Sequence, residues 1–168
     1  MASTQTISEG NGTNAATETG SRTECNWKRI DDSTTAYASS PINASNNENS
    51  MTKYQMLKFA GTWNSLSACT VKIDNNAPAT GLSIVGSVVS AGATPSTTAS
   101  GDAAMSTTGA AVNFVSSTFG YGSGTSSSTA SGTMYTQACR SQLQTTSAYA
   151  GGPGDIATRT FTWTWTES

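Results

Sequence analysis

The sequence predicts an all-β fold, an antiparallel β-sandwich of Ig-like or jelly-roll-like type with an extended N-terminal arm. The first observation is the segment from Arg159 to Ser168, where Phe161, Trp163 and Trp165 alternate with threonines. Successive side chains of a strand point to opposite faces, so the three aromatic residues face a core and the threonines face outward. The second observation is a series of short apolar runs separated by Gly, Pro and Asn, with no heptad and no amphipathic helix.

Further strands are predicted in order along the chain. Residues 51–62 and 66–74 are apolar or alternating runs separated by the short turn 63–65, and we predict that they form a hairpin. The other predicted strands are 82–90, a run marked by Val112, Phe114 and Val115, and 135–143. Between them, 91–108 is a loop of small residues and 119–128 is a Gly/Ser connector.

The domain organisation follows from a change in composition near residue 24. Residues 1–23 are polar, with Ile7 almost the only apolar side chain, so we predict an extended N-terminal arm that orders against a neighbouring subunit. Residues 24–168 form the β-sandwich domain.

The composition excludes several functional classes. The chain has a net charge of −2, eight scattered basic residues and no histidine. Nucleic-acid binders cluster their Lys and Arg, and triad hydrolases and most zinc sites use His, so we expect no nucleic-acid partner, no metal and no cofactor. No signal sequence and no membrane-spanning run is recognised, and we expect the protein to be made in a cytoplasm without a membrane partner.

Only 11% of the residues are charged, and Ser, Thr, Gly, Ala and Asn replace the usual Lys and Glu. Burial of a hydroxyl costs less than burial of an ammonium group, so this surface favours assembly.

The three cysteines are widely spaced along the chain, at Cys25, Cys69 and Cys139. Without a Cys-x-x-Cys pair or a histidine they do not indicate a zinc site. We interpret them as buried free thiols. The alternatives are a Cys69–Cys139 disulfide and an intermolecular disulfide through Cys25.

Motifs that suggest chemistry have simpler structural explanations. Ser50 and Lys53 have the spacing of a serine nucleophile and its lysine, but they open a predicted strand rather than a helix. Gly120, Gly122 and Gly124 resemble a phosphate loop without the helix that should follow. We therefore predict no catalytic residue and a non-enzymatic protein.

Two further groups leave a binding alternative open. Asp31 and Asp32 are predicted to initiate a turn or to accept main-chain hydrogen bonds, the alternative being a calcium site shared with Asp74. The four tryptophans are predicted to be core residues, the alternative being an exposed platform that stacks sugars.

Two regions of the sequence resemble a known class of protein. They are Asn26-Trp-Lys-Arg-Ile-Asp-Asp32 with the nearby Thr-Ala-Tyr37 and Ser-Pro-Ile42, and Lys53-Tyr-Gln55 with Lys58-Phe-Ala-Gly-Thr-Trp-Asn64. Together with the terminal Arg159-Thr-Phe-Thr-Trp163, they are similar to β-rich structural proteins of tailed bacteriophages. The resemblance implies a virion component and carries no active site.

The resemblance leads to a functional expectation. We expect an accessory capsid protein that decorates or cements the particle, the alternatives being a neck, tail or fibre component and a carbohydrate-binding adhesive module. Its partners would be the major capsid protein or other virion proteins, with the chain as a homo-oligomer or lattice neighbour in the virion, assembled in the host cytoplasm. The predicted assembly contacts are Ile7, Trp27 and Tyr37.

Overall fold

The computed structural model describes residues 3–11, 17–23, 27–32, 34–43, 46–73, 79–88, 111–113, 130–136, 138–151 and 160–168. Its strands within these ranges are β1 (Thr4–Asn11), β2 (Thr17–Thr19), β3 (Lys53–Trp63), β4 (Leu66–Ile73), β5 (Leu82–Val88), β6 (Ala111–Asn113), β7 (Ala130–Tyr135), β8 (Cys139–Thr145) and β9 (Phe161–Glu167). A three-residue 3-10 turn, η2 (Tyr37–Ser39), lies between β2 and β3. The protein is therefore strand-rich and almost free of helix, as predicted.

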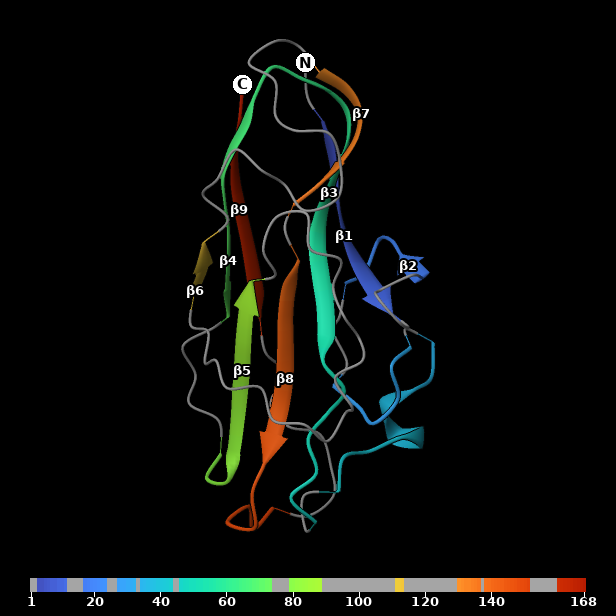
Figure 1. Ribbon diagram of the computed structural model, residues 1–168, viewed down its shortest axis with the longest axis vertical. Helices are drawn as coiled ribbons and strands as arrows, with labels where there is room; N and C mark the ends of the chain where they lie inside the picture. The colour runs from blue at the N-terminus through green and yellow to red at the C-terminus, as the bar shows by residue number, and fades with distance from the viewer. Residues whose placement is uncertain are drawn as a thin grey trace.

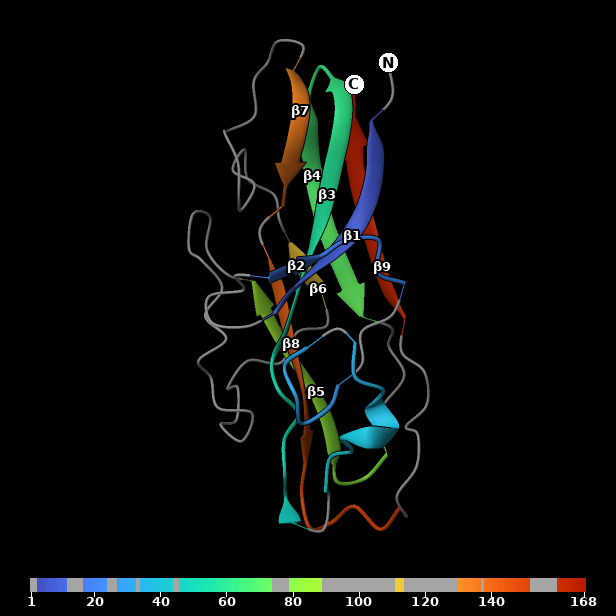
Figure 2. The same cartoon turned by 90° about the vertical axis from the view of Figure 1, so that its right-hand side faces the viewer.

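The larger sheet has the order β2-β1-β3-β8-β5, with β7 also paired to β3, and every pairing is antiparallel. In both views β5 and β8 lie in the lower half of the molecule, while β3, β7 and β1 lie above them (Figure 1 and Figure 2).

The predicted strand 135–143 is divided between β7 and β8, which follow one another along the same edge of β3. Lys58 pairs with Tyr135 and Gln55 pairs with Cys139. Three residue positions along β3 therefore match four positions along the segment that contains β7 and β8. One extra residue on one strand is a β-bulge. Thr136 stabilises it, because its Nα–H donates to the Leu57 carbonyl and its Oγ1 accepts from the Leu57 Nα–H, both at 2.9 Å.

The smaller sheet has the order β6-β4-β9. The predicted hairpin of 51–62 with 66–74 is therefore wrong, because β3 and β4 belong to different sheets. The turn between them is bonded to the end of the chain instead: the Nα–H groups of Asn64 and Ser65 donate to the Ser168 carbonyl at 2.6 and 2.9 Å. Because the main-chain N–H groups of the turn bond the end of β9, β4 pairs with β9 rather than running back along β3.

An apolar cluster joins the two sheets. Its buried members are Leu57, Phe59, Trp63, Leu66, Cys69, Val71 and Cys139, and Ile7, Phe161, Trp163 and Trp165 contact it from the side. Along β9 the aromatic residues are half-buried and the intervening threonines are exposed, which confirms the alternation that the sequence predicts. The contact of Phe59 with Trp165 is edge-to-face, with ring centroids 5.8 Å apart.

The N-terminal segment forms part of the larger sheet, and the predicted extended arm is not confirmed. β1 pairs with β3 from Thr4 opposite Ala60 to Gly10 opposite Tyr54. The prediction of an extended arm considered only the apolar surface that residues 1–23 could bury, and Ile7 supplies little of it. A strand is also held by its main-chain hydrogen bonds and, here, by a buried charge.

That charge is the carboxylate of Glu9, which lies 3.2 Å from the Nζ of Lys53, with both side chains 1% exposed. Lys53 Nζ also donates to the Asp32 carbonyl at 3.0 Å, and Arg22 Nε lies 3.8 Å from the second oxygen of Glu9. Lysine buried to this extent requires such partners, because an unpaired ammonium group loses its hydration without compensation.

A second buried lysine fixes the segment that follows. Lys28 Nζ contacts Asp32 Oδ1 at 2.7 Å and donates to the Thr35 carbonyl at 2.6 Å. Asp32 accepts in turn from the Nα–H groups of Thr34 and Thr35, which confirms its prediction as an acceptor of main-chain hydrogen bonds. The two lysines thus anchor Asp32 and Thr35 beside β1 and β3.

Replacing Lys53 by Met should lower the free energy of unfolding by about 3–5 kcal/mol, because it leaves the Glu9 carboxylate buried without its main partner. The double variant Glu9→Leu/Lys53→Met should lose much less than the sum of the two single variants. Urea unfolding followed by circular dichroism measures all three. Additive losses would show that the two charges do not act as a pair.

Candidate interaction surface

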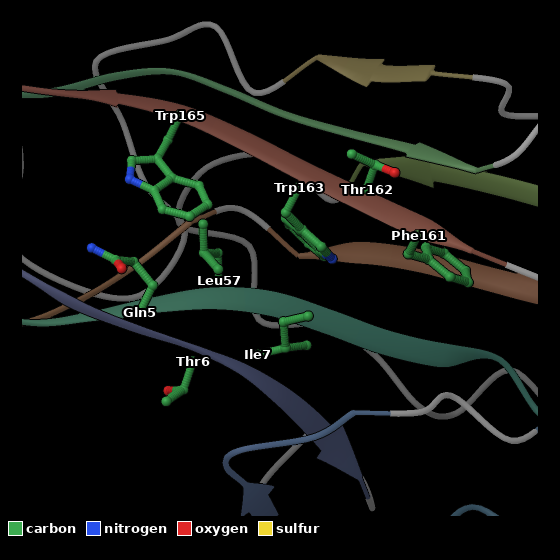
Figure 3. A pocket seen from close by; sticks show the side chains of 8 residues that line it. All are labelled: Gln5, Thr6, Ile7, Leu57, Phe161, Thr162, Trp163 and Trp165. Carbon is green, nitrogen blue, oxygen red and sulfur yellow. The ribbon is translucent and has the colours of Figure 1, made fainter.

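The described residues leave an open groove between β1 and β9. Its volume is about 380 Å³, and it is lined by Gln5, Thr6, Ile7, Leu57, Phe161, Thr162, Trp163 and Trp165. Figure 3 shows the three aromatic side chains projecting from β9 toward Leu57 and Ile7. An apolar, aromatic-lined hollow open to solvent is typical of binding sites in proteins.

The position of the strands explains why the groove is open. β9 is the last strand of the smaller sheet, and β2 covers β1 only at Glu9, Gly10 and Asn11. The other half of β1 therefore lies at the border of the larger sheet, opposite β9 (Figure 2). No described strand lies over this side of the core.

Beside Gln5 of the groove lies the carboxylate of Glu167, which accepts hydrogen bonds from three donors of Ser3 and Gln5. Ser3 donates its Nα–H and its hydroxyl, both at 2.7 Å, and Gln5 Nε2 donates at 3.2 Å. The hydroxyl bond of Ser3, its main-chain bond and the nearby N-terminal amino group lower the pKa of Glu167. We call this set of contacts the Glu167 clasp.

Trp27 lies next to the groove at Phe161. Its ring centroid is 5.9 Å from that of Phe161, and its Nε1 donates to Ser141 Oγ at 3.1 Å. A half-buried tryptophan thereby connects the segment after β2 to β8 and β9.

The predicted assembly contacts are only partly brought together. Ile7 lines the groove and contacts the core, and Trp27 contacts Phe161. Tyr37 begins η2, and its side chain lies outside what the structure describes. Trp163 and Trp165 pack against the core, as the sequence predicts, and they also line the groove, which their alternation with threonine does not reveal.

Ser50 and Lys53 do not form a nucleophile pair. Ser50 Oγ donates to the Met51 carbonyl at 2.9 Å and accepts from the Leu143 Nα–H at 3.0 Å. Lys53 bonds Glu9 and the Asp32 carbonyl. Both side chains therefore have structural partners.

Two of the three cysteines confirm the interpretation as buried free thiols. Cys69 and Cys139 form no disulfide and are almost fully buried, and burial raises the pKa of each thiol to about 12. Thiols this far from the thiolate state are poor nucleophiles. Cys25, Asp74 and residues 119–128 lie outside the described residues.

Within the described ranges no cluster of three or more Cys, Asp or Glu side chains is arranged to hold a metal ion. The same part of the chain has no helix with the length and apolar character that a bilayer crossing requires. No protein-family model matches this chain, and neither a curated protein nor a solved structure matches it significantly.

The Glu167 clasp predicts an acid-dependent loss of stability. Because the folded state lowers the pKa of Glu167, its contribution is complete above the ordinary glutamate pKa of about 4.5 and is lost as the pH falls through the lower folded value. The stability difference between the wild type and Glu167→Gln should therefore be larger at pH 7 than at pH 3.

Thermal unfolding at the two pH values measures this difference. Thr166→Val, a change at the exposed neighbouring position, serves as the matched control. A difference that does not change with pH would show that the carboxylate charge is not what holds the clasp.

Proposed function

We propose that this protein is a non-enzymatic structural component of a tailed-bacteriophage virion, an accessory capsid protein that decorates or cements the shell. The resemblance of residues 25–75 and 159–168 to β-rich phage structural proteins supports the class. The observation that supports a docking role is the groove, where Phe161, Trp163 and Trp165 stay half-exposed beside Ile7. Half-exposed aromatic residues are the commonest anchors of protein interfaces.

In this proposal the two sheets pack as a sandwich, and the side between β1 and β9 contacts the major capsid protein or a neighbouring virion protein. Residues 1–23 contribute through Ile7 of β1 rather than as a free extension. The low content of charged residues, 11%, favours the same role because few ammonium and carboxylate groups must be desolvated on docking.

Immunogold electron microscopy of phage particles from the encoding host tests this function. We expect an antibody to the chain to label the heads. Label confined to necks, tails or fibres would assign the protein to those parts instead, and the absence of label from every particle would exclude the virion role.

A carbohydrate-binding adhesive module is the second candidate, and one observation favours it. Trp163 and Trp165 share the open groove with the amide of Gln5. Aromatic faces beside a few polar groups are the usual means by which proteins stack and orient ligand rings.

This candidate predicts a measurable glycan affinity that depends on Trp165. On a glycan array, and then by fluorescence titration of any hit, Trp165→Ala should weaken binding about tenfold, equal to about 1.4 kcal/mol. Thr164→Ala changes the opposite, exposed face of β9 and should leave the affinity unchanged. The absence of any glycan hit, or equal effects of the two substitutions, would discard this candidate.

A further inference from the structure

The free edge of β9 carries main-chain groups that point away from β4. Ser65 and Ser168 exchange both of their Nα–H···O=C bonds, at 2.9 and 3.1 Å, so the main chain of Ser168 faces β4. Strand groups alternate with a period of two, and the bulge in this ladder adds its extra residue to β4, so the alternation continues along β9. The Nα–H and carbonyl groups of Phe161 and Trp165 therefore point toward the free edge, where no described strand pairs with β9.

This edge lacks the features that keep edge strands from pairing. Natural edge strands are usually protected by lysine, proline or a bulge of their own. From Thr160 to Thr166, β9 has no charged residue and no proline. The groove reaches the same edge, because it is lined by Thr162 of the exposed face as well as by Trp163 of the inner face. An unprotected edge beside an apolar hollow is complementary to a further strand.

The sequence of β9 matches itself in the antiparallel direction. With Trp163 on a two-fold axis, Phe161 lies opposite Trp165 of a second copy, and Thr162 lies opposite Thr164. Aromatic pairs and threonine pairs across neighbouring strands are among the pairs that stabilise sheets. In this register the outward main-chain groups of Phe161 also meet those of Trp165. The complement of β9 is therefore a second copy of β9.

We propose that two copies of this chain associate through β9, whose free edges pair antiparallel across a two-fold axis at Trp163. Phe161 of each copy and Trp165 of the other exchange Nα–H···O=C hydrogen bonds. The two smaller sheets then form one continuous sheet through the dimer. The inner aromatic side chains of the two strands lie side by side and cover the grooves of both copies.

The contacts around the groove stay intact in this dimer. Glu167 has the same alternation as Trp165 along β9, so the Glu167 clasp lies on the inner face of the strand rather than at its free edge. The Ile7 carbonyl keeps its bond from the Arg22 Nα–H, because β1 contributes no main-chain group to the pairing.

The inference names a second copy as the neighbour on the proposed docking side, and in that sense it rests on the proposed function. The two can nevertheless fail separately. A chain that dimerises but labels no virion keeps this inference and discards the virion role. A monomeric chain that labels phage heads does the reverse.

The first measurement is sedimentation equilibrium of the purified wild-type chain at tens of micromolar. We expect a mass twice that of the 17.2 kDa chain. A monomer at this concentration would overturn the proposal. This measurement does not depend on the folding of any variant.

The second measurement locates the axis with Thr162→Cys and Thr164→Cys, each made in a Cys25→Ser background. Both positions are exposed, and in the proposed register they form a non-hydrogen-bonded pair with Cα atoms about 4.5 Å apart, within disulfide reach. In either variant alone, the cysteine and its own symmetry mate lie about 8 Å apart, outside that reach. Cys69 and Cys139 are buried and remain in both variants.

The two variants are oxidised mildly, alone and as an equal mixture, and separated by non-reducing electrophoresis. The mixture should give a covalent dimer, and each variant alone should stay monomeric. Equal crosslinking in all three samples, or none in the mixture, would contradict this register.

A charge exchange on the exposed face tests the same pairing without a crosslink. Thr162→Lys/Thr164→Lys places like charges opposite each other across the axis, so sedimentation should give the monomer mass. Mixing it with Thr162→Glu/Thr164→Glu should restore the dimer mass. A dimer that persists in the lysine variant alone would show that the copies associate through another surface.

Discussion

The buried contact between Glu9 and Lys53 is the interaction on which the arrangement of this protein depends. It joins β1 to β3 at a point where both side chains are 1% exposed, and Lys53 extends the connection to the main chain of Asp32. A polar N-terminal segment has little apolar surface of its own to hold it in place. The ion pair provides specificity instead, because only one register of β1 on β3 gives the lysine a carboxylate.

The position of the groove follows from that register. With β1 fixed on one edge of β3, the bulge between Tyr135 and Cys139 lets β7 and β8 share the other edge. The smaller sheet has three strands and ends at β9, so the aromatic side of β9 faces Ile7 and Leu57 without a further described strand beside it. The open side is a consequence of sheets that end at different positions, and its apolar lining is the border of the core rather than a separate structure.

The sequence predicts the strand content well where one pattern determines the structure. Phe161, Trp163 and Trp165 alternate with threonines, and a half-buried strand is the only simple interpretation of that spacing. The predicted hairpin is wrong because the short turn 63–65 does not show which strand β4 pairs with. The main-chain N–H groups of Asn64 and Ser65 bond Ser168, about one hundred residues away in sequence.

Polar residues account for the other differences between sequence and structure. Glu9, Lys28 and Lys53 look like surface residues in the sequence, since lysine and glutamate are almost never fully buried unless they are paired. Their pairing depends on the fold as a whole, so neither the strand character of residues 4–11 nor the groove between β1 and β9 could be predicted from local composition. Ile7 stands out in the polar N-terminal sequence, but the residues that surround it in the structure come from distant parts of the chain.

The Glu167 clasp has a consequence for the order in which the protein folds. Its bonds join residues 164 positions apart, and the entropy lost in closing a loop increases with the number of residues in it. Contacts between such distant residues form late and slow folding. Until β9 reaches β4, Leu66 lacks its neighbouring strand and Val71 has only β6 beside it. The protein therefore passes through a stage in which its smaller sheet is incomplete and vulnerable to pairing with other chains.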